Sequence, residues 1–330
     1  MLAQLSIFLI FAASFAMAFL VMPPLIRRMA ARGITGKDMN KASKPEVAEL
    51  GGIGPILGIS FGIITAIFIS TYTSALPLNL TILLASFLTI FLVCFIGVID
   101  DVIGWRKGIR QWQHALFPVF AALPLMAVNA GTDFIVLPFL GSVSLGVLYS
   151  LILVPLAITG ASNAFNMLAG FNGLEAGLGS IIIATLSLIA FLTGETEAAI
   201  IGVSVLAALL AFLFYNWYPA RVFGGDSLTL MIGASIATIS IVGNMEKLGL
   251  FIIALHWAEL AFKARHMFQS QNFGIPQRDG RLAPDPRGGS LVHFVLRWRM
   301  MTEKRLVLTL LGAQAVVSAV VFGMFYFRLF

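Results

Sequence analysis

The sequence predicts an all-α integral membrane protein with about ten transmembrane helices. Of its 330 residues, 59% are hydrophobic and only 11% are charged, and the mean hydropathy of +0.97 is far above that of soluble domains. Long apolar runs recur along the whole chain, and the basic residues gather in alternate loops between them. We therefore expect one polytopic domain over residues 1–330, and the composition excludes a pair of soluble domains.

The apolar runs define the candidate helices. About 20 apolar residues are needed to cross the ~30 Å hydrocarbon core of a bilayer, and the sixth and ninth runs are short by this measure. The first run has no basic residues before it and is followed by Arg27 and Arg28, which predicts a retained span and not a cleaved signal peptide. The ten runs lie near residues 2–22, 51–71, 80–99, 113–130, 145–162, 178–193, 198–214, 227–243, 248–262 and 306–327.

Positive charge is concentrated in the loops that follow the odd-numbered runs. All of the 21 Lys and Arg residues except Lys247 and Arg328 lie in these loops. The positive-inside rule then places these loops in the cytoplasm and both termini outside. The net charge of +6 is therefore a topology signal and does not indicate a nucleic-acid partner.

The most informative polar segment is NAFNMLAGFNGLEAG, residues 163–177, between two apolar runs. Unpaired amides and carboxylates each cost roughly several kcal/mol in lipid, so a membrane protein is expected to keep them away from it. Flexible glycine beside such side chains permits close approach of the backbone to a ligand. The segment therefore predicts a ligand site; the alternative is a polar hairpin that joins two helices.

Two adjacent carboxylates, Asp100 and Asp101, follow the third apolar run. The C-terminus of a helix disfavours negative charge, and neighbouring carboxylates repel each other. Such a pair usually requires a cation or a function. Carboxylate and amide oxygens suit a hard ion such as Mg²⁺, which commonly bridges substrate phosphates. The alternative is a pair of end-cap charges on the cytoplasmic side.

A further carboxylate, Asp226, opens the eighth apolar run at the end of the motif NWYPARVFGGD, residues 216–226. The two glycines before it permit a tight turn that aims the carboxylate and nearby N–H groups into a cavity. The alternative is an interfacial aromatic belt beside a topology charge. Because these loops share one side, we expect their polar side chains to form one metal–phosphate site. They are Asp100, Asp101, Asn166, Asn172, Glu175 and Asp226.

At these motifs the chain resembles the polyprenyl-phosphate N-acetylhexosamine-1-phosphate transferases, and most closely the dolichyl-phosphate N-acetylglucosamine-phosphotransferases of eukaryotes and archaea. The resemblance runs nearly end to end. It is carried by GKDMNK at 36–41, the aspartate pair, the motifs at 163–177 and 216–226, and more weakly by TEKRLVLTLL at 302–311. It implies ten spans with a cytoplasmic active site, in agreement with the count of apolar runs.

The resemblance also implies an activity. N-acetylglucosamine 1-phosphate would pass from UDP-GlcNAc to a dolichyl phosphate, with release of UMP, as the first step of lipid-linked oligosaccharide assembly for N-glycosylation. The implied cofactor is Mg²⁺, or Mn²⁺ in its place. The implied partners are a UDP-sugar, dolichyl or another polyprenyl phosphate and membrane lipid. A homodimer is a further possible assembly that the sequence does not decide.

Site residues follow from the resemblance position by position. Asn166 and Asp226 correspond to metal ligands, and Asp100, Asp101, Asp226 and Arg110 to catalytic residues. Arg110 stands where the family has a phosphate-binding lysine, and arginine keeps the charge and binds phosphate bidentately. The nucleotide-binding residues are Gly170, Asn172 and Glu49. The residues that would bind phosphate or lipid phosphate are Lys37, Asn40, Lys41, Arg110, Arg278 and Arg281.

The last cytoplasmic loop, residues 263–305, departs from the family pattern. The family's histidine-containing, arginine-rich motif is replaced by Asn272, Phe273 and Gly274. Arg278, Arg281 or His293 would compensate, or would be ordinary loop charges. In the same loop, residues 290–301 show helical spacing of apolar side chains and predict an interfacial helix at the lipid-phosphate entrance, or one that covers the bundle.

Several alternatives to this assignment remain. The sugar and the acceptor stay open, so another UDP-sugar or undecaprenyl phosphate is the nearest rival, and a lipid-sugar or anion transporter is a more distant one. Asp100 and Asp101 would organise the metal, or Asp100 would act as a base. The lack of a large extramembrane insertion favours the plasma membrane of an archaeon over endoplasmic reticulum.

Overall fold

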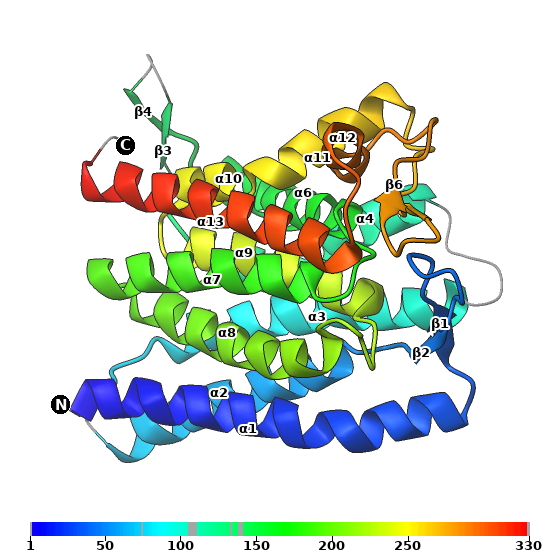
Figure 1. Cartoon of the computed structure of the whole chain (residues 1–330). Coiled ribbons are helices and arrows are strands. Elements are labelled where there is room, and N and C mark those ends of the chain that lie inside the picture. Colours follow the sequence, from blue (N-terminus) through cyan, green and yellow to red (C-terminus); the bar gives the residue numbers. More distant parts are fainter. Residues whose placement is uncertain (1, 74, 105–110, 133, 138–140, 329–330) are drawn as a thin grey trace.

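The computed structural model describes residues 2–73, 75–104, 111–132, 134–137 and 141–328. The described residues form a bundle of long helices that run along one direction (Figure 1). Eight helices are long and apolar enough to cross a membrane, which confirms the all-α membrane class. They are α1 (Leu2–Ala31), α2 (Ile53–Tyr72), α3 (Leu80–Gly104), α6 (Val154–Met167) with the π-turn η1 (Tyr149–Leu153), α7 (Leu174–Thr193), α8 (Thr196–Asn216), α9 (Gly225–Val242) and α13 (Glu303–Tyr326).

Two of the ten expected spans are each divided into a pair of shorter helices. The run at 113–130 forms α4 (Gln111–Ala121) and α5 (Leu123–Ala127), and α5 has a proline in its first turn. Proline has no N–H to donate to the preceding turn, which explains this break. The run at 248–262 forms α10 (Glu246–Ile252) and α11 (Ala254–Arg265), and nothing in the structure explains that break.

The ends of the bundle differ in composition. Both chain termini lie at one end, whereas the polar motif loops lie at the other (Figure 1). This arrangement agrees with the spacing of the basic loops along the sequence. The motif end carries the hairpins β1–β2 and β5–β6 with α12, and the terminal end carries β3–β4. Their bounds are β1 Thr35–Lys37, β2 Glu46–Ala48, β3 Phe134–Leu137, β4 Gly141–Ser144, β5 Ile275–Pro276, β6 Leu282–Ala283 and α12 Leu291–Trp298.

Helix α9 lies at the centre of the bundle, where every residue from 227 to 242 is buried. It packs against α3 and α6. Small residues allow this approach: a Cβ at Gly97 of α3 would lie 2.5 Å from the backbone N of Ser227, and one at Gly233 would overlap the Ala161 carbonyl. Close backbone contact through small residues is a usual way for membrane helices to associate. The N-terminus of α9 is thereby fixed at the middle of the motif end.

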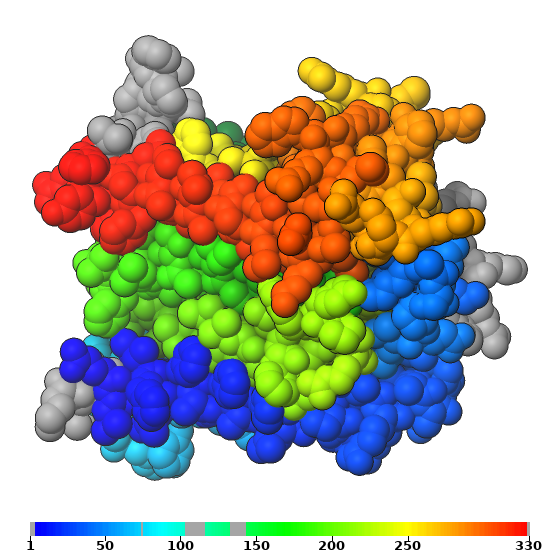
Figure 2. All heavy atoms as spheres, in the orientation of Figure 1, coloured from blue at the N-terminus to red at the C-terminus, as the bar shows by residue number. Residues whose placement is uncertain are grey.

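The outer helices expose large apolar side chains, as expected of a lipid-facing surface. Phe8 of α1, Phe68 of α2 and Val316 of α13 are all more than 60% exposed. In the space-filling view, α1 and α13 lie on either side of the green surface of α7 and α8 (Figure 2).

Candidate active site

The centre of the site is the N-terminus of α9, which Asp101 of α3 caps. Its Oδ1 accepts a hydrogen bond from the backbone N–H of Asp226 at 2.8 Å, and its Oδ2 accepts one from Ser227 at 3.1 Å. The first N–H groups of a helix have no partner inside the helix and form its positive end, so a carboxylate is favoured there. Asp101 therefore fixes the turn that carries the Asp226 side chain.

Gly225 makes this contact geometrically possible. Its φ of +68° lies in the left-handed region, and a Cβ at this position would overlap the Asp101 carboxylate. Only glycine accepts both conditions without strain. The GGD sequence is thus explained by the approach of Asp101 to the helix.

Asn166, at the end of α6, reaches the same turn of α9. Its Oδ1 accepts a hydrogen bond of 2.9 Å from the hydroxyl of Thr229, which lies one turn after Asp226. Asp100, beside Asp101 at the end of α3, is buried, with only 8% of it exposed. The structure therefore places Asp101, Asn166 and Asp226 at the first turns of α9, with Asp100 next to Asp101 at the end of α3.

The donor set suits a hard divalent cation. It offers amide and carboxylate oxygens, but no three His, Cys, Asp or Glu side chains in the described part of the chain form a metal site on their own. Mg²⁺ is commonly held by one or two carboxylates together with substrate phosphates. These residues therefore suit an ion that binds together with a diphosphate. They suit less well an ion that protein ligands alone would hold permanently.

Glu49 belongs to the same acidic region. Burial, and secondly the negative charge of Asp226, raise the pKa of the Glu49 carboxyl above its usual value. Backbone hydrogen bonds hold its loop against the GGD loop: Gly51 N–H donates to Phe223 at 2.9 Å and Phe223 N–H donates to Ala48 at 2.8 Å. The loop that carries Glu49 and the loop that carries Gly225 are therefore held together by backbone hydrogen bonds.

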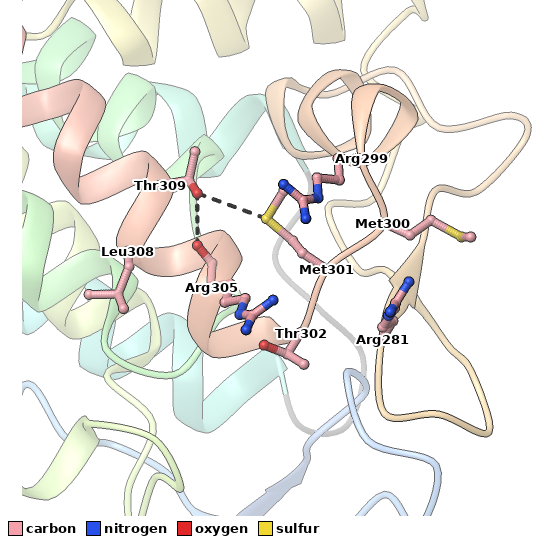
Figure 3. A pocket seen from close by; sticks show the side chains of 8 residues that line it. All are labelled: Arg281, Arg299, Met300, Met301, Thr302, Arg305, Leu308 and Thr309. Carbon is pink, nitrogen blue, oxygen red and sulfur yellow. Dashed lines mark hydrogen bonds between the residues drawn. The ribbon is translucent and has the colours of Figure 1, made fainter.

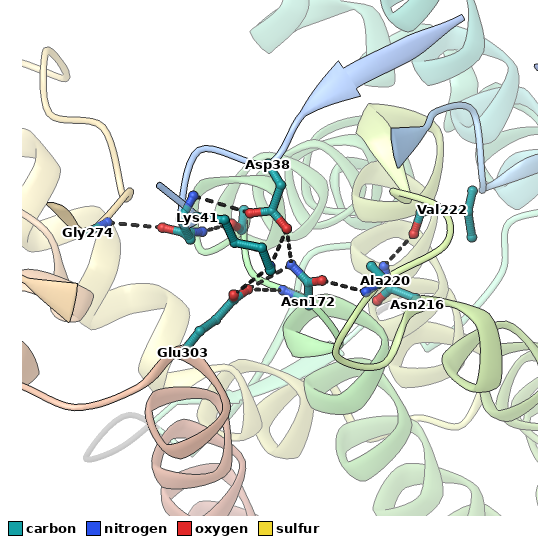
Figure 4. A network of polar contacts seen from close by, with 10 residues as sticks. Asp38, Lys41, Asn172, Asn216, Ala220, Val222, Gly274 and Glu303 are labelled. Atoms are coloured by element: carbon teal, nitrogen blue, oxygen red, sulfur yellow. Dashed lines mark hydrogen bonds and ion pairs between the residues drawn. The ribbon is translucent and has the colours of Figure 1, made fainter. Parts of the chain in front are cut away.

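A second polar group joins three segments that are distant in sequence (Figure 4). The Nδ2 of Asn172 donates to Asp38 Oδ2 at 3.1 Å and to Glu303 Oε1 at 2.7 Å, and its backbone N–H donates to the same Oε1 at 2.9 Å. Its Oδ1 accepts from Ala220 N–H at 2.6 Å. Lys41 forms ion pairs with both Asp38 and Glu303, at 2.9 Å to the latter. We call Asp38, Lys41, Asn172 and Glu303 the buried polar network.

Three of the four members of the network are almost fully buried. Asp38, Asn172 and Glu303 are each less than 5% exposed. Burial disfavours the charged form of Lys41, but the hydrogen bonds and charges of Asp38 and Glu303 outweigh it and raise the pKa of the ammonium. In this arrangement the Asn172 amide is occupied by protein groups. Its assignment to the nucleotide base stays a prediction, while its contacts show that it orders the loop around it.

Gly170 is held in that loop by two hydrogen bonds. Its N–H donates to Glu175 Oε1 at 2.6 Å, and its carbonyl accepts from Asn40 Nδ2 at 2.7 Å. Its φ is +109°, and a Cβ would lie 3.0 Å from the Phe273 ring. Asn40 also accepts a hydrogen bond of 3.1 Å from Gly274 N–H. Asn40, expected at a phosphate, therefore bridges two loops, and Glu175 fixes the backbone at Gly170.

The last loop closes over this region. Asn272 donates to the carbonyls of Met167 and Ala169 at 2.6 and 3.0 Å. His293 is fully buried, burial lowers its pKa, and its ring nitrogens lie 2.8 Å from Ser290 Oγ and 3.1 Å from the Phe273 carbonyl. Both residues thus position Phe273 next to Gly170, which gives His293 a structural contact.

Three of the remaining predicted phosphate ligands are exposed side chains outside the buried polar network. Lys37 on β1 and Arg278 are exposed, and Arg281 forms a surface ion pair of 3.4 Å with Asp279. Arg110 lies outside the described residues. Sequence reasoning missed Asp38 and Glu303 as members of the site. For Glu303, the available signal was its place at the very start of an apolar run, in TEKRLVLTLL.

Comparison with known proteins identifies the family. A sequence model described as glycosyl transferase family 4 matches residues 83–244. A protein of Saccharolobus solfataricus, provisionally named UDP-N-acetylglucosamine--dolichyl-phosphate N-acetylglucosaminephosphotransferase, is 35% identical over 93% of both chains. The Dictyostelium discoideum protein of that name is 27% identical over 95% of this chain and 86% of its own. A Bacillus subtilis protein, provisionally named undecaprenyl-phosphate N-acetylglucosaminyl 1-phosphate transferase, is 27% identical over 72% of this chain and 63% of its own. The chain therefore belongs to glycosyl transferase family 4, as an integral membrane member.

Proposed function

We propose that the protein transfers N-acetylglucosamine 1-phosphate from UDP-GlcNAc to dolichyl phosphate in a Mg²⁺-dependent reaction. The observation that carries the proposal is the assembly of Asp101, Asn166 and Asp226 at the buried N-terminus of α9. The relatives named for this reaction, one of them archaeal and aligned over 93% of both chains, support it.

The reaction needs charge neutralisation and an in-line approach more than it needs a base. A phosphate monoester has a second pKa of ~6 and is largely ionised at neutral pH. A non-bridging oxygen of the acceptor attacks the β-phosphorus of the donor, and the bond to the bridging oxygen breaks, so that UMP leaves with that oxygen. When bound, Mg²⁺ would be held by Asn166 and Asp226 and would supply the positive charge that stabilises the diphosphate and the leaving UMP.

The protein's own groups position these parts. Asp101 fixes the turn that carries Asp226, and Lys41, whose charge is maintained by the buried polar network, lies next to the loop of Gly170. We favour Asp100 as a positioning group. A pH–rate profile of Asp100→Asn tests this: a lost base would leave a residual rate that recovers as pH rises, whereas a positioning group would leave a uniformly lower rate.

The nucleotide base is proposed to bind at Gly170, where the Phe273 ring offers a stacking surface. The basic loops at the motif end support a cytoplasmic site, and the archaeal relative supports an archaeal plasma membrane. Undecaprenyl phosphate is the second candidate acceptor, because the Bacillus subtilis relative is named for it.

One assay tests the proposal. Purified protein is incubated with Mg²⁺, either dolichyl or undecaprenyl phosphate, and a panel of UDP-sugars, and UMP release is measured. We expect the fastest release with UDP-GlcNAc and dolichyl phosphate. Absence of UMP with every sugar, from protein with an intact unfolding transition, would refute the transferase assignment. A faster rate with undecaprenyl phosphate would move the acceptor to the second candidate.

A further inference from the structure

A cavity of about 410 Å³ lies at the start of α13 (Figure 3). None of Asp101, Asn166, Asp226 or the buried polar network lines it. Three segments supply one arginine each: Arg281 precedes β6, Arg299 follows α12, and Arg305 lies in the first turn of α13. The rest of the lining is Met300, Met301, Thr302, Leu308 and Thr309. Met300 and Leu308 are about half exposed, at 48% and 49%, so the cavity opens outward.

The positive charge of this cavity has little compensation. The side chains of Arg299 and Arg305 make no hydrogen bond or ion pair with another residue that the structure describes. The pair between Arg281 and Asp279 is more than half exposed on both sides and is therefore weak. Glu303, the nearest carboxylate along the helix, faces inward and is occupied by Lys41 and Asn172. Two unpaired guanidinium groups and a third with only a weak surface pair favour a phosphate in this cavity, because arginine binds phosphate bidentately.

An apolar path leads from the cavity along the outer face of α13. Leu308, Gly312, Val316 and Val320 are spaced four residues apart, which places them on one side of the helix, and all are exposed. A Cβ at Gly312 would meet no atom within 4 Å, so the path is open at that point. The combination of a cationic cavity with an apolar path matches a headgroup and its hydrocarbon chain.

Helix α12 indicates the depth of the cavity in the membrane. Its Trp298 is 91% exposed and Phe294, one turn earlier, is 57% exposed, while Val292 and Leu296 on the other side are buried. Exposed aromatic side chains of this kind typically lie at the level of the lipid headgroups. Arg299 follows Trp298 directly, so the cavity that Arg299 lines opens near the same level.

We propose that this cavity binds the phosphate of an anionic membrane phospholipid, whose chain lies along Leu308, Gly312, Val316 and Val320. The lipid is a bound structural component and not the acceptor, because the cavity lies on the outer side of α13, whereas Asp101, Asn166 and Asp226 lie inside the bundle. Its binding would fix the first turns of α13, from which Glu303 reaches the buried polar network.

Lipid binding by purified protein tests the proposal without reference to transferase activity. Delipidated protein in neutral detergent is titrated with phosphatidylglycerol, and bound lipid is measured by native mass spectrometry together with the unfolding temperature. The double variant Arg299→Gln, Arg305→Gln is compared with a matched control, Arg265→Gln, Arg287→Gln, which removes two exposed charges at the same end but outside the cavity. We expect affinity to fall by about tenfold or more in the cavity variant only.

Further arms identify the ligand. Gly312→Phe would block the chain path and is expected to weaken phosphatidylglycerol binding while the arginines stay in place. Phosphatidylcholine and inorganic phosphate should bind at least about tenfold more weakly than phosphatidylglycerol. Equal binding of inorganic phosphate would show a free-anion site, displacement by an equimolar amount of dolichyl phosphate would show an acceptor site, and equal affinity of the cavity and control variants would show no site; each result overturns the proposal.

Discussion

Replacement of Glu303 by Gln is the most direct test of the buried polar network. Glu303 is 4% exposed and accepts from Asn172 N–H, Asn172 Nδ2 and Lys41 Nζ at 2.9, 2.7 and 2.9 Å. Glutamine keeps one accepting oxygen but places an NH₂ donor against either Lys41 or Asn172. The substitution therefore removes one of the two anions that pair with Lys41 without changing the size of the side chain.

The magnitude follows from these contacts. Removing one partner of a buried ion pair costs about 3–5 kcal/mol. Lys41 retains Asp38 and is 19% exposed, so the loss should be smaller. We expect a fall of about 2 kcal/mol in the free energy of unfolding, which is the usual cost of losing a hydrogen bond to a charged group. For a chain of this size, 1 kcal/mol lowers Tm by roughly 2 °C, so Tm should fall by about 4 °C.

The same variant should also change the kinetics. Because Asn172 and Gly170 share one loop, we expect a higher KM for the UDP-sugar and a smaller change in kcat. The control is Glu46→Gln, which makes the same chemical change at an exposed position of β2. If the Glu303 variant matched this control in both Tm and KM, the inference that the network positions the loop would be wrong.

Two further predictions concern the centre of the site. Gly225→Ala should lower the free energy of unfolding by about 2–3 kcal/mol, because φ is +68° and the new Cβ would overlap Asp101. The control Gly280→Ala has φ of +78° but open space around it, so it should lower that free energy by only about 1 kcal/mol. Equal losses of stability in thermal unfolding would contradict this explanation. The pKa of Glu49 is raised in the folded state, so the folded protein binds more protons than the unfolded chain and stability falls as pH rises above the usual value of 4.5. Glu49→Gln should therefore raise Tm at pH 7–8 relative to the parent and have little effect at pH 4, and a Tm difference independent of pH would argue against the shift.

The sequence was sufficient to predict the class of fold and which loops meet. Apolar runs indicate helices long enough to span a membrane, and the basic loops between them indicate which loops share one end of the bundle, so the two ends follow from local properties. The position of Asp226 was also predictable, since two glycines before a carboxylate at a helix start indicate a tight turn that aims the side chain. The division of two spans into short helices was less accessible, because only one of the two breaks has a proline at it.

The contacts of individual polar side chains were not predictable in the same way. Asn172 meets Asp38 and Glu303 across 134 and 131 residues of chain, and no local pattern reports such a distance. The family resemblance suggested a role for Asn172 and Asn40 toward a ligand, whereas the structure shows bonds that tie loops together. The family resemblance therefore predicts which residues meet the ligand, whereas the hydrogen bonds show what holds the loop in place.

The buried polar network also sets an order of events during biosynthesis. The segment with Asn172 enters the membrane well before the helix that begins at Glu303, so a partly synthesised chain holds this loop without one of its two anionic partners. We therefore expect the loop that carries Gly170 to gain its last hydrogen-bond partner only when α13 has inserted. A chain interrupted before that helix would retain most of its spans but would lack an ordered site, so catalytic competence reports complete membrane insertion.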